Sequence, residues 1–306
     1  MRVFALGASR NIGYHAALRK SKACSPPCSP LALSNIHRTV MLARGDTVTF
    51  LLRNTNTLQE DEAVKPYIQS GLAVLVKGDA TSQADVQNAW VAASKSGPVD
   101  FIMFTIGECA ASSFSFSTSP DPDLAFSIPG QPDPKFHPTK GFIIDPPNLC
   151  TVALLNTLRC VAATNVRPKL VILTSTGVTS HSHSVLPLPI KVLYSYLLRG
   201  TLQDKRGIET LLYHGLGKEY EAGQTPGSHI LPDGWEKDLP APGWLKSGVV
   251  IRAALLTDGP MTKTYRAAVG DFPCYRVSRA DVGHFIAEGL LSEWSKWEGN
   301  VVCVGY

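Results

Sequence analysis

The chain has 306 residues, of which 44% are hydrophobic and 18% are charged, and its net charge is +4. This composition fits one large globular domain, and the lack of a Lys/Arg cluster argues against a nucleic-acid or membrane partner. Seven scattered cysteines, no apolar run of bilayer length and no signal peptide lead us to expect a reduced, cytoplasmic protein.

The first predicted strand covers residues 2–6, an apolar run typical of a strand buried on both faces. A turn with glycines at residues 7 and 13 follows, and a helix opens at Ile12. Small residues in such a turn let the backbone approach a pyrophosphate, and the start of the helix offers N–H groups and a positive dipole to the anion. This stretch therefore predicts a dinucleotide site.

The first helix is interrupted by residues 19–39, which include three prolines between positions 26 and 30. A helix interior does not tolerate these prolines. The ribose-binding residue usually follows the glycine turn by about 20 positions, whereas Arg53, after the second predicted strand (47–52), follows Gly13 by 40. We therefore expect residues 19–39 to be an insertion, either an unspliced intron or a genuine surface loop.

The residue after the second strand also indicates which dinucleotide is bound. An arginine at this position suits a 2′-phosphate through charge-assisted hydrogen bonds, whereas a carboxylate would favour NAD. Arg53 stands there, and Arg10 can reach the same phosphate, so we expect NADP(H). Asp79, after the third strand (73–77), either meets the adenine edge or assists the cap of the next helix (84–93).

The remaining predicted elements are strands 99–105, 169–174, 249–252 and 300–305 and helices 149–163 and 194–213. Strands that alternate with helices predict a doubly wound parallel α/β sheet. We expect the turn at Ile106 and Gly107 to pass beneath the middle of the cofactor. Because open α/β sheets bind ligands at the carboxyl ends of their strands, Ser175 is a candidate site residue.

Two segments rich in loop-forming residues, 108–148 and 178–247, are expected to form a small substrate-covering lobe on a single domain that spans 1–306. His181 and His183 have no third ligand at a suitable spacing. We therefore expect no metal site there, and we interpret both as loop histidines.

Short motifs follow one another along the chain at 7–13, 51–53, 78–80, 105–107, 174–175, 204–209, 250–252 and 278–282. In their order these motifs make the chain resemble an atypical short-chain dehydrogenase/reductase of the NmrA-like group, which includes relatives of flavin and biliverdin reductases. The resemblance implies a Rossmann domain. It also implies that NADP(H) is bound by Gly7, Ser9, Arg10, Asn11, Ile12, Arg53, Asp79, Ala80, Ile106 and Gly107.

The same resemblance implies that Ser175 orients the substrate and that Lys205 binds ribose or polarises Ser175. The family's usual Tyr-x-x-x-Lys pair is missing, because Thr201 stands four residues before Lys205, and Ala253 replaces a common proline. We therefore keep two functions. One is an NADPH-dependent reductase that transfers hydride to a small carbonyl, quinone or flavin-like acceptor. The other is an NADP(H)-sensing regulator without turnover.

Overall fold

The computed structural model describes residues 1–8, 12–17, 41–107, 135–137, 141–143, 145–221 and 223–306. Its centre is an eight-stranded sheet in the order β10-β12-β8-β7-β4-β1-β2-β3, parallel except for β10. These strands are β1 Arg2–Leu6, β2 Thr47–Leu52, β3 Ala73–Lys77, β4 Phe101–Phe104, β7 Lys169–Ser175, β8 Gly248–Ala253, β10 Arg266–Val269 and β12 Val301–Gly305. The predicted doubly wound α/β sheet is confirmed.

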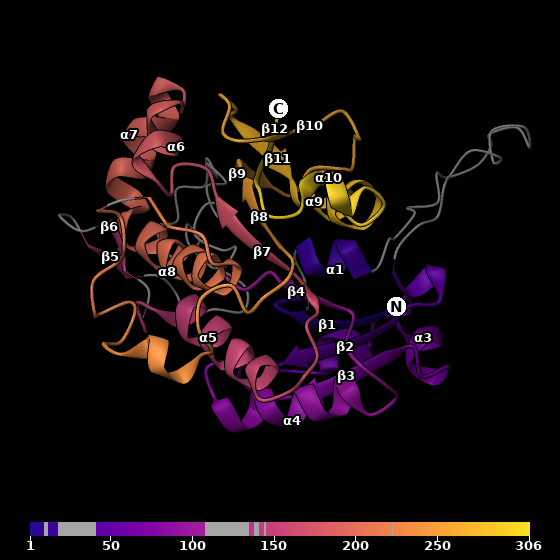
Figure 1. Cartoon of the computed structure of the whole chain (residues 1–306). Helices are drawn as coiled ribbons and strands as arrows, with labels where there is room; N and C mark the ends of the chain where they lie inside the picture. Colours follow the sequence, from indigo (N-terminus) through magenta and orange to yellow (C-terminus); the bar gives the residue numbers. More distant parts are fainter. Residues whose placement is uncertain (9–11, 18–40, 108–134, 138–140, 144, 222) are drawn as a thin grey trace, which may run out of the picture.

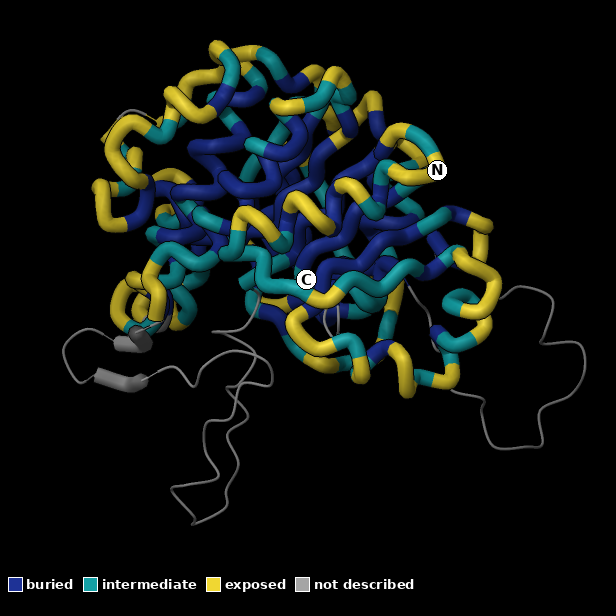
Figure 2. Tube along the Cα trace, turned by 90° about the horizontal axis from the view of Figure 1, so that it is seen from below, coloured by how far each residue is buried: buried dark blue, intermediate teal, exposed yellow. Residues whose placement is uncertain are grey.

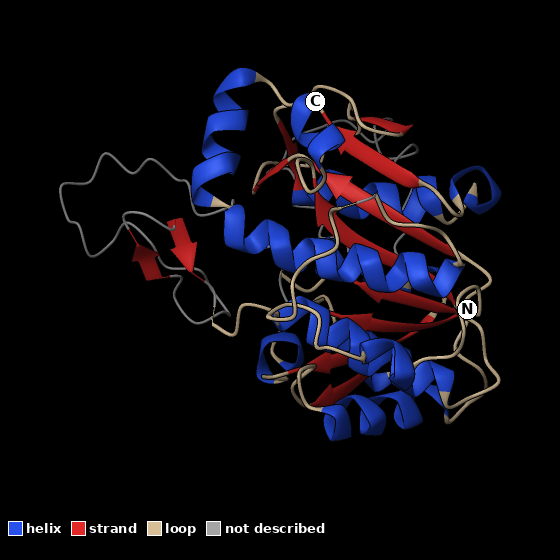
Figure 3. Cartoon of the chain, turned by 60° about the vertical axis from the view of Figure 1, so that its left-hand side comes forward, coloured by secondary structure: helices blue, strands red, loops and turns tan. Residues whose placement is uncertain are grey.

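Helices cover both faces of this sheet (Figures 1 and 3). One face packs against α4 Gln83–Ser94, α5 Leu149–Ala162 and α8 Arg199–Leu216. The other packs against α1 Ile12–Ala17, η2 Leu42–Arg44, α2 Asn56–Gln59, α3 Lys65–Gln69, α9 Arg279–His284, η5 Phe285–Leu290 and α10 Trp294–Trp297. The strands therefore lie in the buried middle layer, which Figure 2 shows in dark blue.

Successive side chains of β1 point to opposite faces of the sheet. Val3 and Ala5 join the core on the α1 side, whereas Phe4 and Leu6 join the core on the α4 side. Side chains alternate along a strand, so a strand with helices on both faces has no solvated side. This is why the strands are continuous apolar runs in the sequence.

Several smaller elements lie outside the main sheet. They are β5 Lys135–His137, β6 Gly141–Ile143, α6 Ser180–Ser184, α7 Leu188–Leu197, η4 Trp235–Asp238, β9 Leu255–Thr257 and β11 Arg276–Ser278. β9 pairs with β11 and β5 pairs with β6, and neither pair is evident from the sequence pattern. Within the ranges above, no helix has the length and apolarity needed to cross a bilayer.

Two predictions about the segment after β7 are wrong. The helix expected at 194–213 is two helices, α7 and α8, because the chain leaves helical geometry at Leu198, where φ is −104° and ψ is 8°. The histidines expected in a loop, His181 and His183, lie in α6. The Thr179 hydroxyl starts that short helix by accepting a hydrogen bond from Ser182 N at 3.2 Å.

The predicted insertion at 19–39 lies outside the described residues. On either side of it, α1 ends at Ala17 and the described chain resumes at Met41. Both residues are fully buried in the same hydrophobic cluster. The flanks of the segment therefore belong to one part of the core.

Candidate functional site

The candidate site lies at the carboxyl ends of β1 and β4, where the strand order reverses direction. Gly7 ends β1 with φ of +81°, and a Cβ added to it would lie 2.6 Å from Ile106 N. A Cβ on Gly13 would lie 2.6 Å from Thr105 Oγ1. The turn, the start of α1 and the end of β4 thus pack so closely that only glycine fits at either position.

The described residues of this turn are Gly7 and Ala8, and Ile12 begins α1 as predicted. Ser9, Arg10 and Asn11 lie outside the described residues, so their cofactor contacts remain predictions. The structure therefore describes the residues on either side of the predicted phosphate-binding turn.

Arg53 and Asp79 lie next to each other at the ends of β2 and β3. Arg53 is exposed, while Asp79 Oδ1 accepts hydrogen bonds from Thr81 N at 2.8 Å and Thr81 Oγ1 at 2.7 Å. Burial opposes ionisation of Asp79, but the Thr81 hydrogen bonds and the Arg53 charge outweigh it and lower the pKa of this carboxyl. An ionised carboxylate and a guanidinium therefore lie side by side at the carboxyl ends of two adjacent strands.

The cap of α4 contacts the backbone of Asp79. The Ser82 hydroxyl caps that helix by accepting from Asp85 N, and Asp85 accepts from the backbone N–H of Asp79 at 2.8 Å. Asp79 thus assists the cap through its backbone, whereas its side chain closes its own turn with Thr81, and its contact with adenine remains a prediction. The turn is further held by Asn156, whose amide donates to the carbonyls of Ala80 and Thr81.

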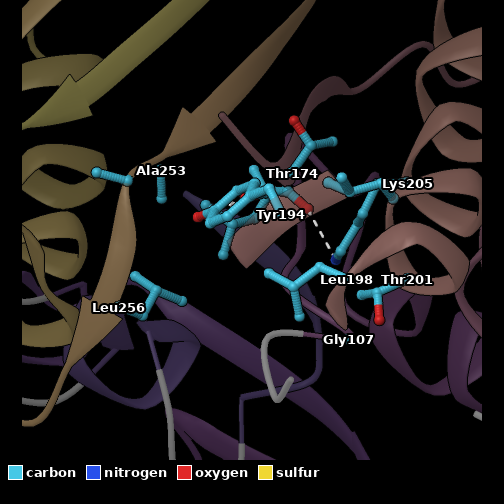
Figure 4. A pocket seen from close by; sticks show the side chains of 12 residues that line it. Gly107, Thr174, Tyr194, Leu198, Thr201, Lys205, Ala253 and Leu256 are labelled. Carbon is cyan, nitrogen blue, oxygen red and sulfur yellow. Dashed lines mark hydrogen bonds between the residues drawn. The ribbon is translucent and has the colours of Figure 1, made fainter. Parts of the chain in front are cut away.

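Lys205 is buried between the ends of β4 and β7. Its Nζ donates to Ile106 O at 2.9 Å and to Leu173 O at 3.3 Å (Figure 4, dashed line). The carboxylate of the neighbouring Asp204 binds a different element, because it accepts hydrogen bonds from the backbone N–H groups of Cys150 and Thr151 at the start of α5. Among the described residues, Lys205 therefore has one ammonium hydrogen left for a ligand.

A pocket opens beside Lys205 and encloses about 450 Å³, its open mouth included. Figure 4 shows its lining, which comes from the strand ends and from α7 and α8. The lining residues are Gly107, Leu173, Thr174, Ser175, Tyr194, Leu198, Thr201, Leu202, Lys205, Ala253, Ala254 and Leu256. The predicted pair of Ser175 and Lys205 is thus brought together at one cavity, next to the predicted Gly107.

Gly107 lines the pocket and has a φ of +86°. A Cβ added there would lie 2.1 Å from Cys150 Sγ and 3.1 Å from Lys205 Nζ. The absent side chain lets the backbone turn between α5 and α8, directly beside the pocket.

Tyr194 lines the pocket although its spacing from the lysines does not fit the family's Tyr-x-x-x-Lys pair. It comes from α7, is 1% exposed and lies with its Oη 3.4 Å from Ser175 Oγ, whose hydroxyl donates to it. Burial raises the pKa of Tyr194, although the Ser175 hydrogen bond opposes the shift. A search for Tyr-x-x-x-Lys could not find it, because Tyr194 and Lys205 lie on different helices.

A buried ion group lies behind the pocket and fixes one of its walls. Arg252 in β8 contacts Glu209 in α8 at 2.7 Å and Asp271 at 2.8 Å, and Glu209 also accepts from Thr174 Oγ1 at 2.8 Å. Burial alone would lower the pKa of Arg252, but the two carboxylates outweigh it and raise that pKa. The motifs at 204–209 and 250–252 therefore meet here as structural partners.

Within the described part of the chain, no cluster of three or more His, Cys, Asp or Glu side chains could hold a metal ion. His183 Nε2 lies 2.9 Å from Ser195 Oγ. The groups that converge on the pocket are hydroxyls and one ammonium, which bind oxygen atoms of organic ligands.

No protein-family model and no curated protein sequence matches the chain. The structure is nevertheless similar to a short-chain dehydrogenase/reductase of Veillonella parvula solved with NADP, at 11% identity and a TM-score of 0.54, over 99% of this chain and 94% of that chain. It is also similar to ChuY of Escherichia coli, described as an anaerobilin reductase, at 14% identity and a TM-score of 0.50, over 99% of this chain and 96% of that chain. These similarities show the fold. It is a Rossmann-type doubly wound α/β fold, as predicted.

Proposed function

We propose that the chain is an NADPH-dependent oxidoreductase of the atypical short-chain type, which reduces a small carbonyl, quinone or flavin-like acceptor. The observation that carries this proposal is the convergence of Ser175, Lys205 and Gly107 on one pocket at the carboxyl edge of the sheet. That edge is where open α/β sheets bind ligands. A small organic substrate is the partner that this pocket suits.

The described residues fit a dinucleotide lying across the strand ends. Arg53 and Asp79 would hold its adenosine half, the turn after Gly7 its pyrophosphate, and Ile106, Gly107 and Lys205 its nicotinamide half. The exposed guanidinium of Arg53 supports NADP(H) over NAD(H), because it can pair with a 2′-phosphate. When bound, the cofactor would supply a hydride.

The chain's own groups would bind and orient the acceptor. Ser175 presents its hydroxyl at the end of β7, where it can donate to an acceptor oxygen. Lys205 is fixed by two backbone carbonyls, so its remaining hydrogen has a defined direction for a ribose hydroxyl or for Ser175.

The test is NADPH oxidation against a panel of aldehydes, ketones, quinones and flavins. We expect turnover with at least one of them. Ser175→Ala should lower kcat by roughly 10²–10³-fold, the loss expected when one oxygen-directed donor is removed, with unchanged NADP⁺ affinity. Ser184→Ala is the control and should leave kcat unchanged, because the exposed Ser184 hydroxyl donates to the His181 carbonyl within α6 and does not line the pocket.

The alternative function is an NADP(H)-sensing regulator. It is favoured by Thr201, which occupies the place of the family's tyrosine four residues before Lys205. Tight NADP⁺ binding, no turnover on any acceptor and no change in Ser175→Ala would support the regulator and refute the reductase.

A further inference from the structure

Helix α7 carries a row of exposed apolar side chains, Leu188, Val192 and Tyr196, which we call the α7 ridge. Leu188 is 74% exposed, Val192 is 66% exposed and Tyr196 is 43% exposed. Because they follow one another at every fourth position, they lie one above the other on one face of the helix. Single exposed apolar residues are ordinary on a protein surface, whereas an aligned row of them indicates a contact surface.

The opposite face of α7 belongs to the protein core. Tyr194 is 1% exposed, and Leu198, which follows the helix, is 3% exposed. Both pack in one cluster with Val178, Leu186 and Leu202. The α7 ridge therefore stands on a helix that is anchored from beneath.

The place of α7 in the fold leaves the ridge accessible to a large partner. The helix lies at the periphery of the molecule in Figure 1. Leu188 and Val192 precede the helix that the sequence pattern predicted, at 194–213, and belong to the separate helix α7. The ridge therefore becomes visible only in the structure.

The segment that carries the ridge has charges of one sign only. Residues 146–203 contain no aspartate and no glutamate. The partly exposed Lys191 lies on α7, and the exposed Arg199 begins α8 one turn after the ridge ends. The next carboxylates along the chain, Asp204 and Glu209, are buried. The segment thus offers a partner apolar side chains with cations beside them.

This charge pattern disfavours a second copy of the chain as the partner. Two α7 helices packed about a twofold axis would bring Lys191 and Arg199 of each protomer towards the same cations of the other. The segment has no carboxylate to neutralise them.

An anionic lipid surface matches both properties of the segment. Its acyl chains accept apolar side chains, and its headgroups attract nearby Lys and Arg residues. Tyr196 suits the boundary between these two zones, because a tyrosine has an apolar ring and a polar hydroxyl. A bilayer crossing takes about 20 residues, and α7 has 10, so the helix would lie along the surface.

We propose that the α7 ridge docks the protein on a bilayer surface that contains anionic lipid, with Arg199 contacting the lipid headgroups. Composition led to the expectation of no membrane partner, because Lys and Arg are not clustered along the chain; the docking surface inferred here is mainly apolar. The inference does not depend on the proposed reductase function. Tyr194 and Leu198, on the other side of the ridge, line the pocket.

The first experiment measures co-sedimentation of the full chain with lipid vesicles in the absence of nucleotide. One set of vesicles is phosphatidylcholine alone, and the other contains phosphatidylcholine and phosphatidylserine in equal parts. We expect the protein to bind the mixed vesicles more tightly than the neutral ones. Added salt should weaken binding to the mixed vesicles, because it screens the charges.

Val192→Glu should lower the affinity for mixed vesicles by about tenfold or more, because it removes an apolar contact and adds a charge of the same sign as the lipid. Val91→Glu is the matched control. Val91 is 59% exposed and lies within α4, so this variant changes the net charge equally but should leave vesicle binding little changed.

A second pair of variants tests the electrostatic part. Arg199→Gln should lower the affinity for mixed vesicles by about fivefold, the contribution of one basic residue near an anionic surface. Arg276→Gln, at an exposed arginine of β11, should have little effect. Melting temperatures check that each variant is folded, and Leu188→Gln tests the ridge at a second position.

The outcomes separate docking from its competitors. No binding of the wild type to mixed vesicles, or an equal loss in Val192→Glu and Val91→Glu, would overturn the proposal. A wild-type dimer in sedimentation velocity that Val192→Glu dissociates would assign the ridge to a second copy instead. NADPH turnover without vesicle binding would refute only the docking, and vesicle binding without NADP⁺ binding would refute only the reductase.

Discussion

At the scale of single residues, positive-φ glycines differ in what surrounds them. Gly107 and Gly45 have nearly the same φ, +86° and +84°. A Cβ on Gly107 would meet Cys150 Sγ at 2.1 Å, whereas a Cβ on Gly45 would meet nothing within 4 Å. Alanine substitutions at Gly45 and Gly107 therefore separate two contributions to the loss of stability. One is backbone strain, which both share, and the other is the steric clash that only Gly107→Ala introduces.

Gly45→Ala should lower the free energy of unfolding by about 1–2 kcal/mol, the cost of a left-handed backbone for alanine. Gly107→Ala should cost about 1–3 kcal/mol more, because the added methyl displaces Cys150 or Lys205. Urea unfolding of both variants measures the difference. Equal losses would show that the space beside Gly107 is not limiting.

At the scale of elements, buried ions join β8 to α8 and to the loop that follows β10. Arg252 is 4% exposed, Glu209 is fully buried, and Asp271 is 5% exposed. Glu209 also accepts hydrogen bonds from the hydroxyls of Thr174 and Tyr220, and Asp271 accepts one from Ser182. The group therefore links three segments around the pocket wall.

Arg252→Met should lower the free energy of unfolding by about 3–5 kcal/mol, since it leaves two carboxylates buried without their cation. Arg159→Met is the control, because the Arg159–Asp238 pair is partly exposed on both sides and should contribute less than about 1 kcal/mol. Chemical denaturation of the two variants makes the comparison. Similar small losses would mean that water reaches the Arg252 group.

The first helix gives a second prediction at this scale. α1 ends at the buried Ala17, and the chain returns to the same core at Met41. If residues 19–39 are an insertion, their deletion should preserve the fold and raise the melting temperature, because a shorter connection costs less entropy to close. Melting curves with and without NADP⁺ test this. Equal melting temperatures for the two proteins would count against it.

At the scale of the whole molecule, the candidate dinucleotide site runs across both halves of the sheet. It extends from Arg53 at β2, past the turn after β1, to Lys205 between β4 and β7. A ligand that binds only the folded state stabilises it by mass action. Cofactor preference should therefore appear as a difference in thermal stability.

We expect NADP⁺ at about 100 times its Kd to add roughly 2.7 kcal/mol to the free energy of unfolding. NAD⁺ at the same concentration should add less. Arg53→Gln should reduce the difference between the two nucleotides, while Arg276→Gln, at an exposed arginine of β11, should not. A larger melting shift with NAD⁺ than with NADP⁺ would contradict the assignment of Arg53 to a 2′-phosphate.

Much of the fold follows from local pattern. The strands at residues 2–6, 47–52 and 73–77 begin and end where predicted, and serine hydroxyls cap α4 and α9, at Ser82 and Ser278. Apolar runs and capping side chains act over a few residues, so the sequence displays them directly. Short strands such as β9 and β11 were missed because their pairing depends on distant partners.

The sequence by itself determined the parallel sheet, the glycines at the crossover and Ser175 at the edge of the sheet, because apolar runs and the residues that end them mark the strand ends. Lys205 was expected at this edge only from the family resemblance, since it lies on α8. Only the tertiary structure decided that Asp79 closes a turn, that Glu209 pairs with Arg252, and that Tyr194 reaches Ser175. The physical reason is that these contacts join separate elements. Their geometry depends on where helices such as α7 and α8 end and how they pack, which residue spacing along the chain does not encode.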